Sequence, residues 1–112
     1  MEITKERKDN YTILKINAEK LDSFLSPALK AEFVVLSKEG VNRFLVDLTD
    51  VKYCDSSGLS ALLVGNRLCN ETNGKFVLSN MQEMVVKLIE ISQLNKILNI
   101  TNDLQSADKL LA

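Results

Sequence analysis

Residues 44–59 read FLVDLTDVKYCDSSGL, and this stretch sets the architecture of the chain. Its first five residues form an almost uninterrupted apolar run, which is typical of a short buried strand. From Leu59 to Cys69, apolar residues recur at the spacing of a helix. The four residues Asp55-Ser56-Ser57-Gly58 therefore lie where a strand is followed by the start of a helix.

The segments on both sides of this stretch alternate between strand and helix patterns. Asp9-Asn10 supplies a hairpin turn between the first two strands. The expected strands are 3–8, 11–17, 44–48, 75–78 and 96–100, and the expected helices are 26–40, 57–70, 81–91 and a last one in which Leu104, Ala107 and Leu111 face inward. A hairpin followed by this alternation predicts a single small α/β domain over residues 1–112, with a mixed, mostly parallel sheet of about five strands and about four helices.

Local signals predict where helices begin and which side chains face the core. Ser26-Pro27 has the pattern of a cap followed by a first helical residue. Thr101 or Asn102 is expected to cap the last helix. In the third helix, the spacing predicts that Met84 and Ile91 face the core.

The composition excludes several classes of function. The chain has 112 residues, with 14 basic and 15 acidic side chains, so no net field attracts nucleic acid. Its longest uncharged stretch, 56–66, is too short to span a bilayer, which predicts no membrane insertion. The first five residues carry charge where a signal peptide needs an apolar run, so we expect a cytoplasmic protein.

The residue inventory also argues against an enzyme. The chain has no histidine, which removes the commonest general base, and its four glycines are scattered rather than gathered in a phosphate-binding loop. Two cysteines without histidine are too few for a zinc site, so we expect no catalytic residue, metal or cofactor. The cysteines are expected to be buried fillers, although Cys54 lies beside the serine pair and leaves redox control open.

The serine pair itself allows two interpretations. Asp55, Ser56 and Ser57 are all good capping residues, so one of them is expected to cap the helix in any case. The first N–H groups of a helix lack intrahelical partners and lie at the positive end of its dipole. A phosphoryl group there would add about −1.5 to −2 charges in a place that tolerates anions, and would repel a docked protein. The motif favours a switch over a catalyst.

The order of elements and three stretches of sequence are similar to the STAS domain family. The matching stretches are residues 45–59, 73–78 and 93–98. Within the family, the chain most resembles the small bacterial anti-sigma factor antagonists. The resemblance implies that the unphosphorylated protein binds an anti-sigma factor with serine kinase activity, and that a sigma factor is thereby released. Phosphorylation of the serine directly after the aspartate, here Ser56, ends the complex, and a serine phosphatase restores it.

The resemblance also implies a partner-binding surface. Its members in this sequence are Asp22, Asp55, Ser56, Ser57, Gly58 and Leu59. Gly58 is expected to let a partner backbone come close, because it has no side chain. The chain departs from the family at residues 18–22, AEKLD, where members usually carry Gly-Glu-apolar-Asp, one residue shorter.

Two other classes of protein are alternatives to this interpretation. A STAS domain can serve as a non-catalytic subunit of a transporter complex or of a larger stress-signalling assembly, in which Ser56 is never phosphorylated. A phosphoaspartate receiver with Asp47 as acceptor is disfavoured, because residues 16–18 lack the acidic pair that would hold magnesium.

Overall fold

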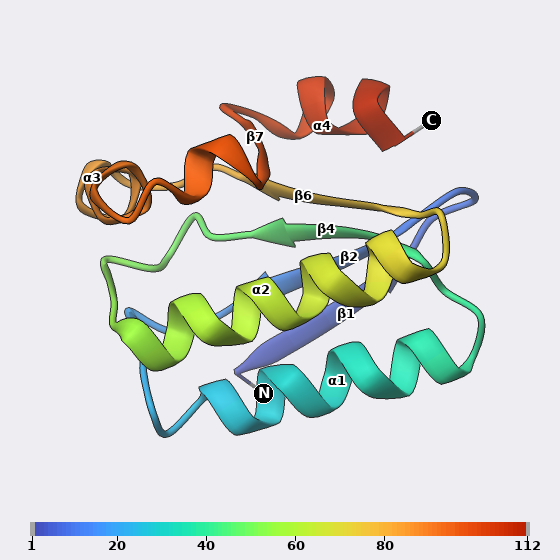
Figure 1. Cartoon of the computed structure of the whole chain (residues 1–112), viewed down its shortest axis with the longest axis horizontal. Helices are drawn as coiled ribbons and strands as arrows, with labels where there is room; N and C mark the ends of the chain where they lie inside the picture. The colour runs from blue at the N-terminus through green and yellow to red at the C-terminus, as the bar shows by residue number, and fades with distance from the viewer. Residues whose placement is uncertain (1, 112) are drawn as a thin grey trace.

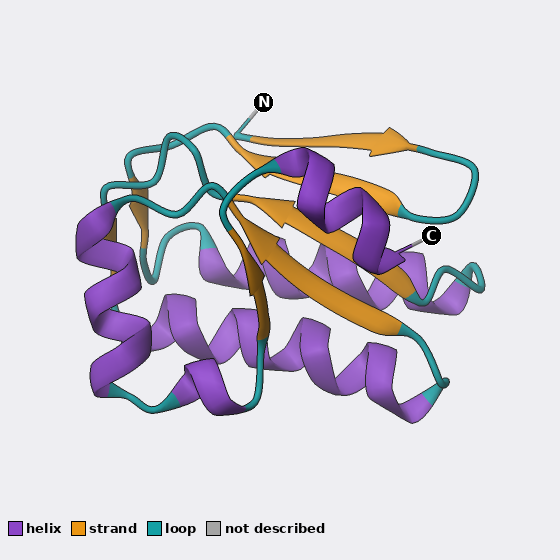
Figure 2. Cartoon of the chain, turned by 90° about the horizontal axis from the view of Figure 1, so that it is seen from above, coloured by secondary structure: helices purple, strands orange, loops and turns teal. Residues whose placement is uncertain are grey.

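A five-stranded sheet forms the centre of the structure, a computed structural model that describes residues 2–111 (Figures 1 and 2). The strands follow the order β1-β2-β4-β6-β7. Their bounds are β1 (Ile3–Arg7), β2 (Thr12–Ile16), β4 (Arg43–Asp47), β6 (Lys75–Ser79) and β7 (Asn99–Thr101). β1 pairs antiparallel with β2, and every later pair in this sheet is parallel. The predicted mixed, mostly parallel α/β sheet is confirmed.

One face of this sheet is covered by two helices, α1 (Ser26–Lys38) and α2 (Ser56–Glu71), which lie side by side in both views (Figures 1 and 2). The ring of Phe33 stacks on Phe44 with a centroid distance of 5.4 Å and meets Phe76 edge-on at 5.6 Å. A side chain at Gly65 would come within 2.9 Å of the Phe33 ring. Gly65 therefore lets α2 pack closely onto this aromatic core, which fixes the helix and its N-terminus.

The opposite face of the sheet is covered by the short helix α4 (Leu104–Leu111) (Figure 1). Ala107 and Leu111 are buried there, as predicted, against a second small apolar cluster that includes Leu45. The Tyr11 hydroxyl donates a hydrogen bond to the Asp108 carboxylate at 2.6 Å. Leu104, expected to face inward, is exposed in the first turn of this helix.

The segment between β6 and α4 differs most from the sequence prediction. The helix α3 (Glu83–Ile91) buries only Val85 and Ile89, one turn apart on a single stripe. Met84 and Ile91 lie off that stripe and are exposed, so the expectation that they face the core was wrong.

The strand predicted at 96–100 was also placed incorrectly. A 3-10 turn, η1 (Leu94–Lys96), occupies its first part, and strand pairing begins only at Asn99. Gln93 has a positive φ of 60°, which ends the helical segment and turns the chain towards the sheet.

Two short strands that the sequence did not reveal connect distant parts of the chain. The strands β3 (Lys20–Leu21) and β5 (Tyr53–Cys54) pair in parallel, and each has only two residues. Strands this short carry no recognisable alternation of polar and apolar residues. Their pairing holds the segment after β2 against the segment that leads into α2.

The caps of two helices also differ from the predictions. Leu25 occupies the cap position of α1 without a side-chain hydrogen bond, and Ser26 is already the first helical residue. The carboxylate of Asp103 accepts a hydrogen bond from the Ser106 backbone N–H at 2.7 Å. Asp103 therefore caps α4, in place of the predicted Thr101 or Asn102, because it stands three residues before the N–H that needs an acceptor.

A buried hydroxyl in the sheet yields a stability prediction. Ser79 is fully buried at the end of β6, and its Oγ has no hydrogen-bond partner within residues 2–111. Because a buried polar group without a partner loses its hydration, Ser79→Ala is expected to raise the free energy of unfolding by about 1 kcal/mol. Urea denaturation of the two proteins measures the difference. A less stable Ser79→Ala protein would contradict this account.

Candidate functional site

The residues expected to form a partner surface gather where two loops meet the N-terminus of α2. The chain reaches α2 directly from β5, and β5 pairs with β3, which is followed by Asp22. The Asp55 N–H donates to the Leu21 carbonyl at 3.3 Å, so the two loops are joined next to the helix. This place lies at the end of the sheet to which β4 points (Figure 1). We call these residues the Ser56 site: Asp22, Asp55, Ser56, Ser57, Gly58 and Leu59.

Asp55 is the N-cap of α2. Its Oδ1 accepts the backbone N–H of Gly58 at 3.0 Å and the Ser57 hydroxyl at 2.6 Å. These two hydrogen bonds, that of Ser57 first, hold the pKa of Asp55 below its ordinary value. The carboxylate is therefore ionised at neutral pH, and its contribution to the cap is lost only as the pH falls through that lowered pKa.

Ser57 is bound into a network that connects α2 to α1. Besides its bond to Asp55, its Oγ lies 3.3 Å from the Oγ of Ser26. Ser26 in turn donates its hydroxyl to the Asp22 carbonyl at 2.6 Å. The Asp22 carboxylate accepts the Phe24 N–H at 3.1 Å and so shapes the turn before α1 without capping that helix directly. The hydroxyl of Ser57 thus has a structural role.

Ser56 differs from its neighbour in both exposure and bonding. It is the first residue of α2, it is exposed, and its hydroxyl has no hydrogen-bond partner among the residues that the structure describes. The helix positions it beside the N–H groups of the first turn, where an anion is favoured. Of the two adjacent serines, Ser56 is therefore the one whose hydroxyl is both exposed and free of hydrogen bonds within residues 2–111.

Gly58 and Leu59 face the inside of the protein more than the outside. Gly58 is buried, and a Cβ there would come within 2.6 Å of the Cys54 Sγ and closer still to the Leu21 carbonyl oxygen. Gly58 is therefore needed for close packing within this chain, which corrects the expectation that it admits a partner backbone. Leu59 is partly buried and packs against the main core.

Two exposed aromatic side chains border the site, and sequence reasoning did not single them out. Phe24, in the turn that follows Asp22, is 92% exposed. Tyr53, in β5, is 47% exposed. Phe24 sits in a polar loop without periodicity, and an aromatic residue in such a place is the one signal that could have drawn attention to it.

The charges around the site are mixed, with an excess of acids. Residues 19–22 contribute Glu19, Lys20 and Asp22, and residues 50–55 contribute Asp50, Lys52 and Asp55. Lys52 lies 3.3 Å from Glu19, which pairs one acid and one base across the two loops. A phosphate on Ser56 would add its charge to a surface that already has more carboxylates than lysines.

The region near the site also contains the Cys54 thiol and side chains of the types that can bind a metal ion. Cys54 is buried, and burial first, with nearby Asp55 second, raises the pKa of its thiol to about 12. A thiol with that pKa is protonated at neutral pH, which argues against the redox control left open by the sequence. Within residues 2–111, no cluster of three or more His, Cys, Asp or Glu side chains is arranged to hold a metal ion.

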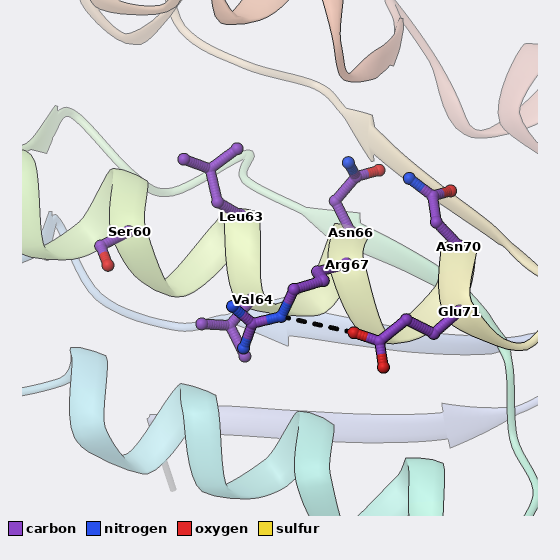
Figure 3. Close-up of a pocket in the computed structure, with 7 residues that line it drawn as sticks. All are labelled: Ser60, Leu63, Val64, Asn66, Arg67, Asn70 and Glu71. Carbon is purple, nitrogen blue, oxygen red and sulfur yellow. Dashed lines mark ion pairs between the residues drawn. The ribbon is translucent and has the colours of Figure 1, made fainter.

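A shallow hollow lies farther along the outer face of α2 (Figure 3). Its lining residues are Ser60, Leu63, Val64, Asn66, Arg67, Asn70 and Glu71, and its volume is about 590 Å³. Its two charged residues, Arg67 and Glu71, are exposed and paired with each other at 3.6 Å (Figure 3). The hollow is open and presents no set of converging polar groups.

Comparison with known proteins finds similar proteins that are named as anti-sigma factor antagonists. The chain is 28% identical over 102 residues to the anti-sigma-B factor antagonist of Bacillus subtilis, covering 90% of this chain and 93% of the relative. An anti-sigma factor antagonist from Mycobacterium paratuberculosis has a similar structure, with a TM-score of 0.86 at 18% identity over 97% of this chain and 92% of the other.

A third similar protein is the anti-sigma factor antagonist SpoIIAA. Its unphosphorylated form superimposes with a TM-score of 0.77 at 15% identity over 96% of both chains. A phosphorylated form of SpoIIAA from Bacillus has also been solved, with a TM-score of 0.75 at 17% identity over 96% of this chain and 98% of the other.

None of the helices in residues 2–111 has the length and apolar character to cross a bilayer. The sheet order, the two helices on one face and the serine pair at the head of α2 agree with the resemblance noted in the sequence. The sequence profile of the STAS domain matches residues 2–107, nearly the whole chain. The chain belongs to the STAS domain family.

Proposed function

We propose that this protein is an anti-sigma factor antagonist of the cytoplasm that is switched by phosphorylation of Ser56. In the unphosphorylated state it binds an anti-sigma factor with serine kinase activity, and a sigma factor is released. In the phosphorylated state it leaves that partner, and a serine phosphatase returns it to the binding form. The protein is a substrate and a binding partner in this cycle, not an enzyme.

The observation that carries the proposal is the contrast between two adjacent serines. Ser56 is exposed and has no partner for its hydroxyl within residues 2–111, whereas Ser57 is held by Asp55 and Ser26. A kinase needs a hydroxyl that it can reach and orient, and Ser56 meets that need without any rearrangement of α2. The relative named as an anti-sigma-B factor antagonist supports the antagonist role of the protein.

The transfer itself requires nothing from this chain but the hydroxyl. The Ser56 Oγ forms a bond to the γ-phosphorus of ATP, the bond from that phosphorus to the bridging oxygen breaks, and ADP leaves. The partner kinase supplies the nucleotide, the magnesium and the base that takes the serine proton. The phosphatase reverses the modification with water and releases inorganic phosphate.

The added phosphate acts on the interface and leaves the fold intact. At the N-terminus of α2 an exposed anion is favoured by about 0.3–1 kcal/mol, so the domain has no reason to unfold. A partner that covers Ser56 must instead remove water from a dianion, or place it against its own groups, which costs several kcal/mol. A hundredfold loss of affinity needs only about 2.7 kcal/mol.

A phosphorylation assay tests this assignment. We expect the cognate anti-sigma factor kinase with ATP to add one phosphate per chain, and peptide mapping to place it on Ser56. Ser56→Ala should abolish incorporation completely, because it removes the accepting oxygen. Ser57→Ala is the matched control and should still be phosphorylated, because its hydroxyl serves the cap of α2.

Two outcomes of this assay would overturn the proposal. Phosphate mapped to Ser57 or to any other residue would refute the choice of Ser56. A native protein that binds its partner but never accepts phosphate would instead support the second reading, a STAS subunit that works in a transporter or a larger stress-signalling complex without a phosphoswitch.

A further inference from the structure

We infer that Phe24 and Tyr53 anchor the partner on either loop of the Ser56 site, with Phe24 as the dominant contact. This inference rests on the proposed function, since the occupant is the protein that covers unphosphorylated Ser56. It assigns to that partner an apolar pocket that receives the Phe24 ring, close to the place where the partner engages Ser56.

The distribution of aromatic residues in the chain is the first argument. Phe24 and Tyr53 are the two largely exposed aromatic side chains within residues 2–111, at 92% and 47%. The other aromatic residues of the chain are buried: Tyr11, Phe33, Phe44 and Phe76. An aromatic ring left in water contributes nothing to folding, whereas aromatic side chains are enriched among the residues that dominate binding energy at interfaces.

The second argument is that hydrogen bonds and strand pairing tie the backbone at both positions to the segments beside the N-terminus of α2. Tyr53 pairs with Lys20 in the β3–β5 ladder and lies three residues before Ser56. The Phe24 N–H is bound by the Asp22 carboxylate, and the Asp22 carbonyl is bound by Ser26, which reaches Ser57. The backbone at both positions is thus fixed in the free protein, so a partner that covers Ser56 and extends over these two loops would lose little ordering entropy on binding.

The charges beside the rings define the chemistry of the occupant. Asp22 and Asp55 are acceptors that flank the site, and the pKa of Asp55 is held low by its hydrogen bonds to Ser57 and Gly58. The complementary surface is an apolar pocket bordered by hydrogen-bond donors or basic side chains. Phosphorylation still weakens this complex, because a covered dianion on Ser56 must lose its hydration beside the Asp55 carboxylate.

The experiment measures binding and phosphorylation with the purified partner kinase, defined as the protein that binds the native chain and phosphorylates it in the presence of ATP. We expect Phe24→Ala to weaken binding by about 30-fold and Tyr53→Ala by about fivefold or more. In the kinase reaction, Phe24→Ala should raise KM by a similar factor and leave kcat unchanged, because the ring contributes to binding and not to the transfer.

Three controls separate this role from a structural one. Ile91→Ala removes a side chain that is 79% exposed at the end of α3 and should change neither binding nor KM. Phe24→Tyr keeps the ring and should restore most of the affinity. The melting temperature of Phe24→Ala should equal that of the native protein, because the ring is almost wholly in solvent.

Each possible result decides between the claims. Native affinity in Phe24→Ala, together with release by Ser56→Asp, would overturn this inference and leave the proposed function standing. A failure of Ser56→Asp to release the partner would refute the proposed function and this inference with it. A native dimer that dissociates in Phe24→Ala, measured by sedimentation velocity, would assign the ring to a second copy of this chain and also refute the inference.

Discussion

The substitution Ser56→Asp is expected to weaken binding of the anti-sigma factor by at least about 100-fold, or about 2.7 kcal/mol, with no loss of thermal stability. The side chain stands exposed at the first position of α2, where a carboxylate is favoured by the helix dipole. The stability of the unbound protein therefore changes little. The complex loses affinity because a covered carboxylate must be stripped of water next to Asp55. Isothermal titration calorimetry and a thermal melt measure the two quantities.

Two variants show whether charge and position cause the loss. Ser56→Asn has nearly the shape of Ser56→Asp without its charge, so it should bind far more tightly than Ser56→Asp. Ser60→Asp places the same charge one helical turn farther along α2, at another exposed position, and should weaken binding much less. Equal binding of Ser56→Asp and the native protein would refute the electrostatic account.

A second large effect is expected at Gly58, on which the geometry of the site depends. Gly58→Val should lower the free energy of unfolding by about 3 kcal/mol, because there is no room for a side chain between α2 and β3. A Cβ already meets the Leu21 carbonyl and the Cys54 sulfur, and the carbonyl belongs to the backbone of the β3–β5 pair, which would have to shift. Denaturation in urea measures the loss, and partner binding should fall as well, because both loops of the site shift.

Ser60→Val is the matched control for this substitution. It introduces the same side chain in the same helix at an exposed position, and because serine and valine have similar helix propensities, the free energy of unfolding should change little. A Gly58→Val protein as stable as Ser60→Val would mean that the packing at Gly58 is looser than the structure shows.

The large elements of this fold were predictable from the sequence because each has a strong local signal. The buried run at 44–48 and the stripe of α2 appear as β4 and α2 within a residue or two of their expected limits. The hairpin, the sheet that it makes mixed, and the four helices were predicted for the same reason. Hydrophobic periodicity is a local property, and these elements follow it.

The details that shape the site were not predictable, because they depend on residues far apart in sequence. The β3–β5 pair joins residues 20–21 to residues 53–54, and neither segment is long enough to show a pattern. The Ser57 and Ser26 hydroxyls lie close to each other between α2 and α1, so Ser57 has a structural role. Ser56 remains exposed. The sequence alone allowed Asp55, Ser56 or Ser57 to cap α2, and only the fold shows that Asp55 does so.

The sequence also did not predict which large apolar side chains are exposed. Met84 and Ile91 follow helical spacing and still lie in solvent, because α3 packs one narrow stripe against the domain. Phe24 gave no periodic signal, yet its turn is tied by hydrogen bonds to the head of α2. Apolar character does not by itself tell a core residue from one that faces a partner.

The most direct test compares the native protein before and after stoichiometric phosphorylation of Ser56, with affinity for the anti-sigma factor and melting temperature measured on the same two samples. We predict at least a hundredfold loss of affinity and a melting temperature that is unchanged or slightly higher, because the phosphate rests at a helix N-terminus. Retained affinity in the phosphorylated sample, or a loss of affinity accompanied by a large fall in melting temperature, would contradict the account.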